Sequence, residues 1–286
     1  MTGPASVTSP ADLTGLVDFR LDGRIAVVTG SGQGIGSAVA VRLAAAGAIV
    51  VGLDRQAPER TTALIEAAGG AAGHRVCDMA DVEEIRRTFD WVTETYGGVD
   101  ILVNNAARGS HTLPAELTSE ELAGVLQVNV AGYFFAAQAA HRSMVRRGGG
   151  SIVNMSSIGA TSGLGRGNFA YSISKAAVEQ LTRELAVEWA LDRVRVTAVA
   201  PSQVRTEGFA PLLTDQRLDA GSVGDRMLRG VPWGRLAEPA EIASVVHFLA
   251  SDAAAFMTGA VLPVDGGNRA LNAGGTVGSQ TVGARA

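Results

Sequence analysis

Short apolar runs that alternate with helix-like patterns are the feature that most constrains the fold of this chain. The runs are rich in Val, Ile and Leu, which is typical of strands covered on both faces. Strands are predicted at Arg24–Thr29, Ala48–Leu53, Gly73–Cys77, Asp100–Val103, Ser151–Met155, Arg195–Val199 and Ala260–Val264. Helices are predicted at Ile35–Ala46, Pro58–Ala68, Val82–Tyr96, Leu117–Arg146 (with a bend at Gly132), Asn168–Ala190 and Glu241–Ala250. This alternation predicts an α/β protein of the Rossmann type, with a doubly wound parallel sheet.

The predicted elements follow one another without a Pro-, Gly- or Ser-rich linker, so we expect a single domain. A length of 286 residues suits one large domain. We expect the domain to cover residues 21–267, after an N-terminal extension at 1–20. Residues 201–236 are rich in loops and are predicted to form a substrate lid. The Gly/Ala/Thr-rich tail at 268–286 is expected to be disordered or to reach a neighbouring subunit.

Composition and charge argue against several classes of function. The net charge of -4 and the lack of a basic run predict no nucleic-acid partner. Cys77 is the only cysteine, so no intrachain disulfide is possible, which fits a reducing cytoplasm. The start of the chain lacks a secretory signal, and no apolar run reaches the ~20 residues of a membrane helix. The histidines lack ligand spacing, so no metal site is expected; they are His74, His111, His141 and His247.

A glycine-rich turn follows the first predicted strand and opens the first helix. It reads T-G-x-x-x-G-x-G from Thr29 to Gly36, and not the strict G-x-G-x-x-G pattern. Glycines let the chain turn tightly and let a pyrophosphate approach the free N–H groups of the helix N-terminus. A tight connection is the alternative. The position after the first strand favours a dinucleotide site that includes Gly30, Gln33, Gly34, Ile35 and Gly36.

Polar residues at the ends of the next strands indicate which cofactor is bound. Asp54 ends the second strand, where a carboxylate accepts hydrogen bonds from the adenosine ribose and repels a 2′-phosphate. This favours NAD over NADP, although the basic Arg55 is adjacent and Asp54 could be a turn residue. Asp78 and Met79 follow the third strand, and Asn105, Ala106 and Ala107 follow the fourth. Ligands of such sheets bind outside the carboxyl ends of the strands.

Tyr171 and Lys175 are the residues that best indicate chemistry. Their i, i+4 spacing on a predicted helix places both side chains on one face, and Lys175 is the only lysine in the chain. A free phenol has a pKa near ~10, and a neighbouring cation lowers it, so Lys175 would make Tyr171 a usable acid-base. Ser157, after the fifth strand, could bind the substrate oxygen. Asn129 could hold a water in a proton relay, or it could be a satisfied core amide.

Taken together, these residues resemble the short-chain dehydrogenase/reductase family over about Leu21–Gly267. The ordered motifs that carry the resemblance are Thr29–Gly36, Asn104–Ala107, Asn129, Ser157, Tyr171-x-x-x-Lys175, Pro201 with Thr206, and Val264–Gly267. The resemblance implies a seven-stranded parallel sheet and usually a homotetramer, in which the two long helices pack against their symmetry mates. Three departures are Ala107 and Ser202 where glycine is usual, and one extra residue between Ser157 and Tyr171.

The resemblance also implies a role for each site residue. Tyr171 would exchange a proton with the substrate oxygen, and Lys175 would bind the nicotinamide ribose as well. Ser157 would orient the substrate oxygen, and Asn129 would hold the relay water. Asp78 would meet adenine. Pro201, Val204 and Thr206, with Ile101–Asn104, would line the other end of the cofactor.

The substrate is predicted only as a class. Four side chains near the expected pocket could bind it: Arg108, His111, Asn168 and Arg205. The leading prediction is NAD-linked hydride transfer on a secondary alcohol or ketone, with a small polyol, sugar or sugar acid as substrate. Two alternatives stay open. One is an NADPH-dependent 3-oxoacyl or other ketone reductase, and the other is a non-catalytic NAD-binding sensor.

Overall fold

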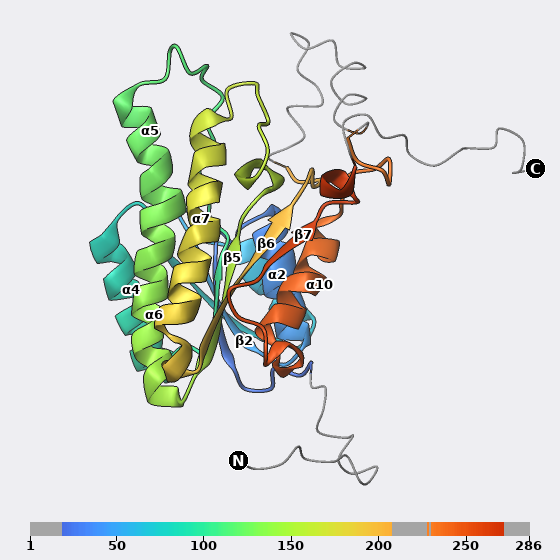
Figure 1. Ribbon diagram of the computed structural model, residues 1–286. Helices are drawn as coiled ribbons and strands as arrows, with labels where there is room; N and C mark the ends of the chain where they lie inside the picture. Colours follow the sequence, from blue (N-terminus) through green and yellow to red (C-terminus); the bar gives the residue numbers. More distant parts are fainter. Residues whose placement is uncertain (1–18, 208–227, 229, 272–286) are drawn as a thin grey trace, which may run out of the picture.

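The computed structural model describes residues 19–207, 228 and 230–271, and it contains one sheet (Figure 1). Its seven strands are all parallel, in the order β3-β2-β1-β4-β5-β6-β7. Their bounds are β1 Ile25–Thr29, β2 Ile49–Asp54, β3 Ala71–Val76, β4 Ile101–Asn104, β5 Gly150–Met155, β6 Val194–Pro201 and β7 Val261–Val264. The predicted Rossmann-type sheet is confirmed. The strand order reverses between β1 and β4, where such sheets bind ligands at the carboxyl ends of their strands.

Helices cover both faces of the sheet (Figure 1). One layer contains α2 (Gly34–Ala45), α3 (Glu59–Ala67) and α10 (Pro239–Ala250), and the other contains α4 (Val82–Tyr96), α5 (Ser119–Leu126), α6 (Tyr133–Arg147) and α7 (Phe169–Glu188). Four 3₁₀ turns lie in the connections: η2 Ile158–Ala160, η3 Ala190–Asp192, η4 Asp252–Ala254 and η5 Asn268–Ala270. The β1 residues alternate between two cores, Ala26 and Val28 in one and Ile25 and Val27 in the other. This explains why the strands read as unbroken apolar runs.

The long helix predicted over Leu117–Arg146 is interrupted by a π-helical segment. It consists of α5, the π-helix η1 (Gln127–Gly132) and α6. A Cβ at Gly132 would collide with the carbonyl oxygen of Met79, so glycine permits a close approach here. Wide turns of this kind are frequent at functional sites, and η1 contains Asn129. The long helix was predicted with a bend at Gly132, and the structure places its irregular turn immediately before that residue.

Among the described residues, Ser119–Arg147 is the one stretch that is long and apolar enough to span a membrane. In this structure the stretch packs on the sheet, and its residues Ala136, Ala137 and Ala140, all on α6, are fully buried in the core. A core helix of a globular domain passes the same test of length and composition.

Smaller differences from the predictions have local causes. Strand β3 begins at Ala71, because its pairing with β2 extends back to Ile49. Helix α10 begins at Pro239, where Glu238 and Glu241 form a capping box. Of the predicted lid at 201–236, residues 208–227 and 229 lie outside the described residues, as do 1–18 and 272–286. The predicted tail at 268–286 begins with the ordered turn η5, so its first residues are neither disordered nor separate from the domain.

Candidate active site

The glycine-rich turn between β1 and α2 is held by close backbone contacts. A Cβ at Gly36 would collide with the carbonyl oxygen of Gly30, so only glycine fits there. Asn105, after β4, donates from Nδ2 to the carbonyl oxygens of Thr29 and Gly30 at 3.0 Å each. The Thr29 hydroxyl in turn accepts from the backbone N–H groups of Asn105 and Ala106. The sequence predicted the glycines, but it did not indicate that Thr29 and Asn105 hold the turn against β4.

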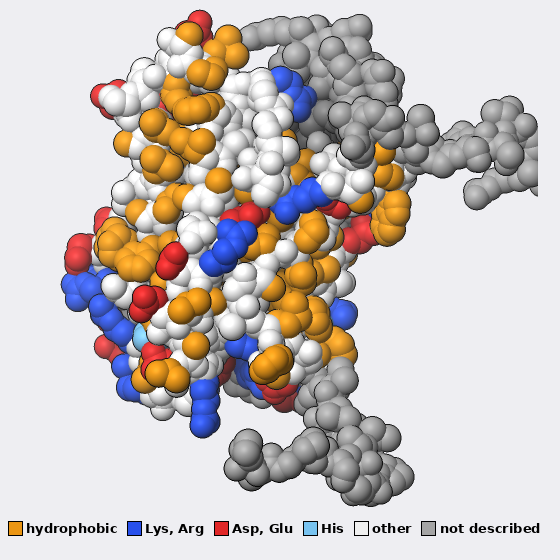
Figure 2. Space-filling model, in the orientation of Figure 1, with side chains coloured by type: hydrophobic (Ala, Val, Ile, Leu, Met, Phe, Trp, Pro, Cys, Tyr) orange, Lys and Arg blue, Asp and Glu red, His pale blue; other side chains and the backbone are white. Residues whose placement is uncertain are grey.

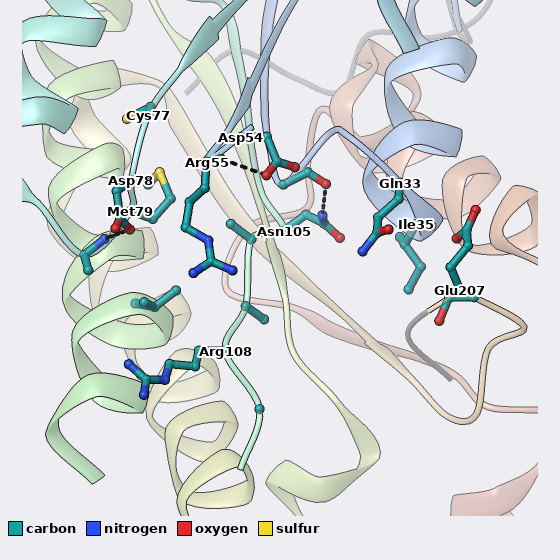
Figure 3. A pocket seen from close by; sticks show the side chains of 18 residues that line it. Gln33, Ile35, Asp54, Arg55, Cys77, Asp78, Met79, Asn105, Arg108 and Glu207 are labelled. Carbon is teal, nitrogen blue, oxygen red and sulfur yellow. Dashed lines mark hydrogen bonds between the residues drawn. The ribbon is translucent and has the colours of Figure 1, made fainter. Parts of the chain in front are cut away.

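Asp54 lies at the end of β2 beside this turn (Figure 3). Its Oδ2 accepts from the Gly32 N–H at 2.9 Å and its Oδ1 from the Arg55 N–H at 2.7 Å. One carboxylate edge therefore supports the glycine turn. The Arg55 side chain reaches into the same cavity (Figure 3). The structure thus brings together an acidic and a basic group at the position predicted for the adenosine ribose.

A cavity of about 500 Å³ lies at the carboxyl ends of β1 to β4. Most residues predicted for the cofactor line it, namely Gly30, Gln33, Gly34, Ile35, Asp54, Arg55, Asp78, Met79, Asn105, Ala106, Ala107 and Thr206. Five others do not. Gly36 supports the turn from behind, Pro201 is buried at the end of β6, and Val204 forms an isolated bridge with Ala237. Tyr171 and Lys175 belong to the neighbouring catalytic group.

The cavity also has lining residues that the sequence did not reveal: Cys77, Ala80, Gly109, Val128 and Glu207. Most of them are small or apolar. Their position after a predicted strand or next to a predicted site residue is the only feature of the sequence that could have indicated them. Burial raises the pKa of the Cys77 thiol to about 11. Cys77 therefore lines the cavity as a neutral apolar group and not as a nucleophile.

Ser157 and Tyr171 meet between the end of β5 and the start of α7. Ser157 is the N-cap of η2, and its Oγ accepts from the Gly159 N–H at 3.1 Å. Its side chain also forms a hydrogen bond with Tyr171, which lowers the pKa of the phenol. Burial is the larger effect, and the pKa of Tyr171 is raised above its ordinary value. Tyr171 is therefore a protonated phenol at neutral pH.

Lys175 has different partners from those expected. Its side chain is 1% exposed, and its Nζ donates to the Met155 carbonyl oxygen at 2.7 Å and to the Tyr133 hydroxyl at 3.2 Å. Burial lowers its pKa from 10.5 to about 7. Nζ lies 5.6 Å from the centre of the Tyr171 ring. Burial is the main influence on both groups, because it disfavours the phenolate of Tyr171 and the ammonium of Lys175. The lowering of the Tyr171 pKa by Lys175 stays a prediction.

Asn129 joins the loop after β4 to helix α7. Its Oδ1 accepts from the Arg108 N–H at 2.8 Å, and its Nδ2 donates to the Arg108 carbonyl oxygen at 3.0 Å and to the Ser174 hydroxyl at 2.9 Å. Ser174 in turn donates to the Tyr171 carbonyl oxygen. The sequence left two roles open for Asn129, a core amide and a holder of a relay water. Both amide hydrogens of Asn129 are used by Arg108 and Ser174, as expected for a satisfied core amide. The relay water remains a prediction.

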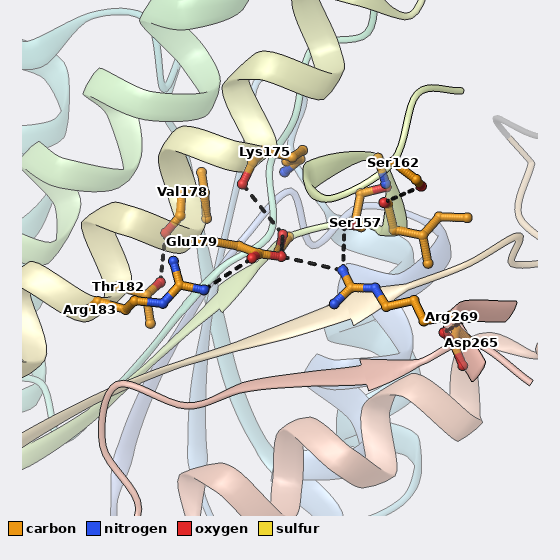
Figure 4. A network of polar contacts seen from close by, with 12 residues as sticks. Ser157, Ser162, Lys175, Val178, Glu179, Thr182, Arg183, Asp265 and Arg269 are labelled. Carbon is orange, nitrogen blue, oxygen red and sulfur yellow. Dashed lines mark hydrogen bonds and ion pairs between the residues drawn. The ribbon is translucent and has the colours of Figure 1, made fainter. Parts of the chain in front are cut away.

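A buried carboxylate lies behind Ser157 (Figure 4). Glu179, 4% exposed on α7, accepts from Ser156 Oγ at 3.0 Å, from Arg183 at 3.3 Å and from Arg269 at 3.4 Å. Arg269 also donates to the Ser157 carbonyl oxygen at 3.2 Å. The sequence analysis missed this network, because Arg269 lies in the segment predicted to be a tail. The network connects η5 to the backbone of the candidate catalytic serine.

The four residues predicted to contact the substrate are not gathered in one place. Arg108 lines the cofactor cavity. His111 is exposed, and its backbone packs against Gly167. Asn168 donates to the Gly165 carbonyl oxygen in its own loop at 2.7 Å. Arg205 forms an ion pair with Glu238 and lines a different hollow, between α2 and α10. Arg108 therefore lines the cavity itself, whereas Arg205 lines an adjoining hollow that shares Gln33, Gly34, Thr206 and Glu207 with the cavity.

No group of three or more His, Cys, Asp and Glu side chains in the described ranges is arranged to hold a metal ion. The polar groups beside the cavity include the phenol of Tyr171, the hydroxyl of Ser157 and the amino group of Lys175. Together, this fold and this site define a nucleotide-binding oxidoreductase that transfers a hydride to or from a secondary alcohol or ketone.

The chain belongs to the short-chain dehydrogenase/reductase family. A family model described as enoyl-(acyl carrier protein) reductase matches residues 30–269. The D-threitol dehydrogenase of Mycolicibacterium smegmatis is 40% identical over 264 residues, which cover 91% of this chain and 98% of that protein. The galactitol 2-dehydrogenase (L-tagatose-forming) of Cereibacter sphaeroides is 41% identical over 251 residues, covering 87% and 96%.

A solved structure is also similar to this chain over most of its length. An Agrobacterium tumefaciens protein, provisionally assigned as a 2-deoxy-d-gluconate 3-dehydrogenase, was crystallised with bound NADP. It is 37% identical to this chain with a TM-score of 0.82, over 88% of this chain and 99% of that one. The bound NADP concerns that protein and leaves the cofactor preference of this chain open.

Proposed function

We propose that this protein is an NAD-dependent dehydrogenase that oxidises a secondary hydroxyl group of a small polyol, sugar or sugar acid. The observation that carries the proposal is the grouping of Ser157, Tyr171 and Lys175 at the same edge of the sheet as the cavity. The similarity to threitol and galactitol dehydrogenases supports a polyol substrate.

The site residues suit the proton half of this reaction. When bound, the nicotinamide accepts the hydride from the carbinol carbon. The hydroxyl proton of the substrate passes to the phenolate oxygen of Tyr171, and the Ser157 hydroxyl holds the substrate oxygen. Because burial raises the pKa of Tyr171, the phenolate becomes more abundant as the pH rises. We therefore expect oxidation to be faster under alkaline conditions and ketone reduction to be favoured near neutrality.

Asp54 supports NAD as the cofactor, since its carboxylate faces the cavity at the end of β2. A negative charge there repels the 2′-phosphate of NADP. A second candidate function is favoured by Arg55, whose cationic side chain lies in the same cavity. In that case, the protein is an NADPH-dependent reductase of a 3-oxoacyl group or another ketone.

The test combines cofactor binding with turnover. Wild-type protein and Tyr171→Phe are titrated with NADH and NADPH by nicotinamide fluorescence, and both are assayed on a panel of polyols, sugars and sugar acids. We expect tighter binding of NADH, oxidation of a member of the panel by the wild type, and loss of turnover with intact NADH binding in Tyr171→Phe. Preference for NADPH with reduction of ketones would favour the second candidate. Cofactor binding without any turnover would favour a sensor.

We further propose that the protein acts as a homotetramer in the cytoplasm. Helices α6 and α7 expose large apolar side chains, namely Val145, Phe169, Ile173, Val187 and, just beyond α7, Leu191, and apolar side chains gather over the side of the molecule drawn in Figure 2. Apolar side chains on one face of a helix pair are typical of an interface. Light scattering on the purified protein tests this proposal, and a monomeric mass would contradict it.

A further inference from the structure

Tyr133 is a buried phenol that the proposed function does not use. It is the first residue of α6, directly after the π-helical segment, and its side chain is 0% exposed. Its hydroxyl accepts from Lys175 Nζ at 3.2 Å and donates to the Met155 carbonyl oxygen at 3.5 Å. Nζ also lies 5.0 Å from the centre of the Tyr133 ring. The phenol therefore contacts Lys175 with both its polar and its aromatic parts.

A buried ammonium group needs such partners. Lys175 has three N–H donors, and two of them are used by Met155 and Tyr133. The nearest buried carboxylate on α7, Glu179, is bound by Ser156, Arg183 and Arg269. Burial is the resolved influence on Lys175, so no carboxylate among the described residues offsets it. The Tyr133 hydroxyl and the Met155 carbonyl are thus what stabilise the charged form.

We propose that Tyr133 is a positioning residue for Lys175. The hydroxyl of Tyr133 holds the ammonium of Lys175 against the Met155 carbonyl. A hydroxyl suits this position because it accepts from Nζ and donates to the carbonyl oxygen at the same time. The contact at 3.2 Å is longer than the one to Met155 at 2.7 Å. The Met155 carbonyl is therefore the closer partner of Nζ, and the Tyr133 hydroxyl holds it from a second side.

The catalytic meaning of this contact rests on the proposed function, but the contact itself is testable without turnover. Lys175 is the only lysine in the sequence, so protein labelled with [13Cε]lysine gives a single lysine resonance. Its chemical shift is followed against pH in the ligand-free wild type, where Lys175 should titrate near about 7. Tyr133→Phe keeps the ring and removes the hydroxyl. Tyr96→Phe is the matched control, because Tyr96, Tyr133 and Tyr171 are the three tyrosines of the chain.

In Tyr133→Phe, the titration of Lys175 should move down by about one pH unit, equivalent to ~1.4 kcal/mol, because the ammonium loses a hydrogen-bond acceptor. In Tyr96→Phe it should stay at the wild-type position. If Tyr133→Phe does not fold, Tyr133→Met offers a second test with an adaptable side chain and the same expected direction. An unmoved titration in a folded Tyr133 variant would overturn the inference. Lack of turnover in the wild type would instead count against the proposed function and leave this result intact.

Discussion

Replacing Lys175 by methionine should stabilise the ligand-free protein at low pH. The pKa of Lys175 falls from 10.5 to about 7 because the side chain is buried. One pH unit corresponds to ~1.4 kcal/mol, so holding the ammonium in the folded protein costs about 5 kcal/mol below pH 7. Methionine has a similar length and no charge. The substitution also removes the hydrogen-bond donor to Met155 and Tyr133, which lowers the free energy of unfolding by about 1–3 kcal/mol. The net gain is about 2–4 kcal/mol at pH 6.

The gain should shrink as the pH rises. Because the folded pKa of Lys175 lies below its unfolded value, the unfolded chain holds the proton between about pH 7 and 10.5 while the folded protein releases it. This group therefore makes the wild type more stable with rising pH in that range. At pH 8.5, its cost has fallen to about 3 kcal/mol, so the advantage of Lys175→Met should fall by about 2 kcal/mol between pH 6 and 8.5.

Scanning calorimetry of both proteins at pH 6.0 and 8.5, at equal concentration and without cofactor, measures the effect. A gain of 2–4 kcal/mol should raise the Tm of Lys175→Met by roughly 5–10 °C at pH 6, together with loss of turnover. Arg42→Met is the control, because it removes an exposed helix cation and should show no such pH dependence. A Lys175→Met protein that is less stable at pH 6, or an advantage that is equal at both pH values, would refute the reasoning.

Two further variants test other parts of the site. Asp54→Ala should weaken NADH binding about tenfold and narrow the preference over NADPH in nicotinamide fluorescence titrations. An unchanged ratio would mean that Asp54 only supports the turn through Gly32. Arg269→Met should lower the Tm by a few degrees and reduce kcat, because Glu179 is 4% exposed and loses a charged partner. Arg183→Met removes the more exposed partner of Glu179 and should have the smaller effect, so equal losses would contradict the role assigned to Arg269.

The fold could be predicted from the sequence because local patterns and the global structure agree. Buried parallel strands favour runs of apolar residues, and every strand except β3 contains such a run, with polar residues mainly near its ends. The edge strand β3 reads Ala-Ala-Gly-His-Arg-Val and is only partly buried, which is why its bounds were misplaced. The π-helical segment leaves no such pattern. It depends on the approach of Gly132 to the Met79 carbonyl, and that contact joins residues far apart in the chain.

In the candidate site, too, local patterns could be predicted and contacts between distant residues could not. Motif spacing identified Ser157, Tyr171 and Lys175, since i, i+4 spacing and strand ends follow from the sequence. Partners supplied by tertiary packing could not be found in this way. Arg269 reaches Ser157 across 112 residues of sequence, and Tyr133 reaches Lys175 across 42. Neither spacing carries a signal, because helical and strand periods extend over a few residues only.

These unpredicted partners alter the chemistry that the motif suggests. A Tyr-x-x-x-Lys pattern implies an ammonium that lowers the pKa of the phenol, but the spacing does not determine where Nζ points. In this protein, Met155 and Tyr133 take Nζ, and burial raises the pKa of Tyr171 while it lowers that of Lys175. Burial therefore favours a neutral phenol at Tyr171 and favours loss of the proton from Lys175. The motif therefore fixes which residues share one face of α7, whereas the packing of Tyr133 and Met155 around Nζ sets the partners of the lysine.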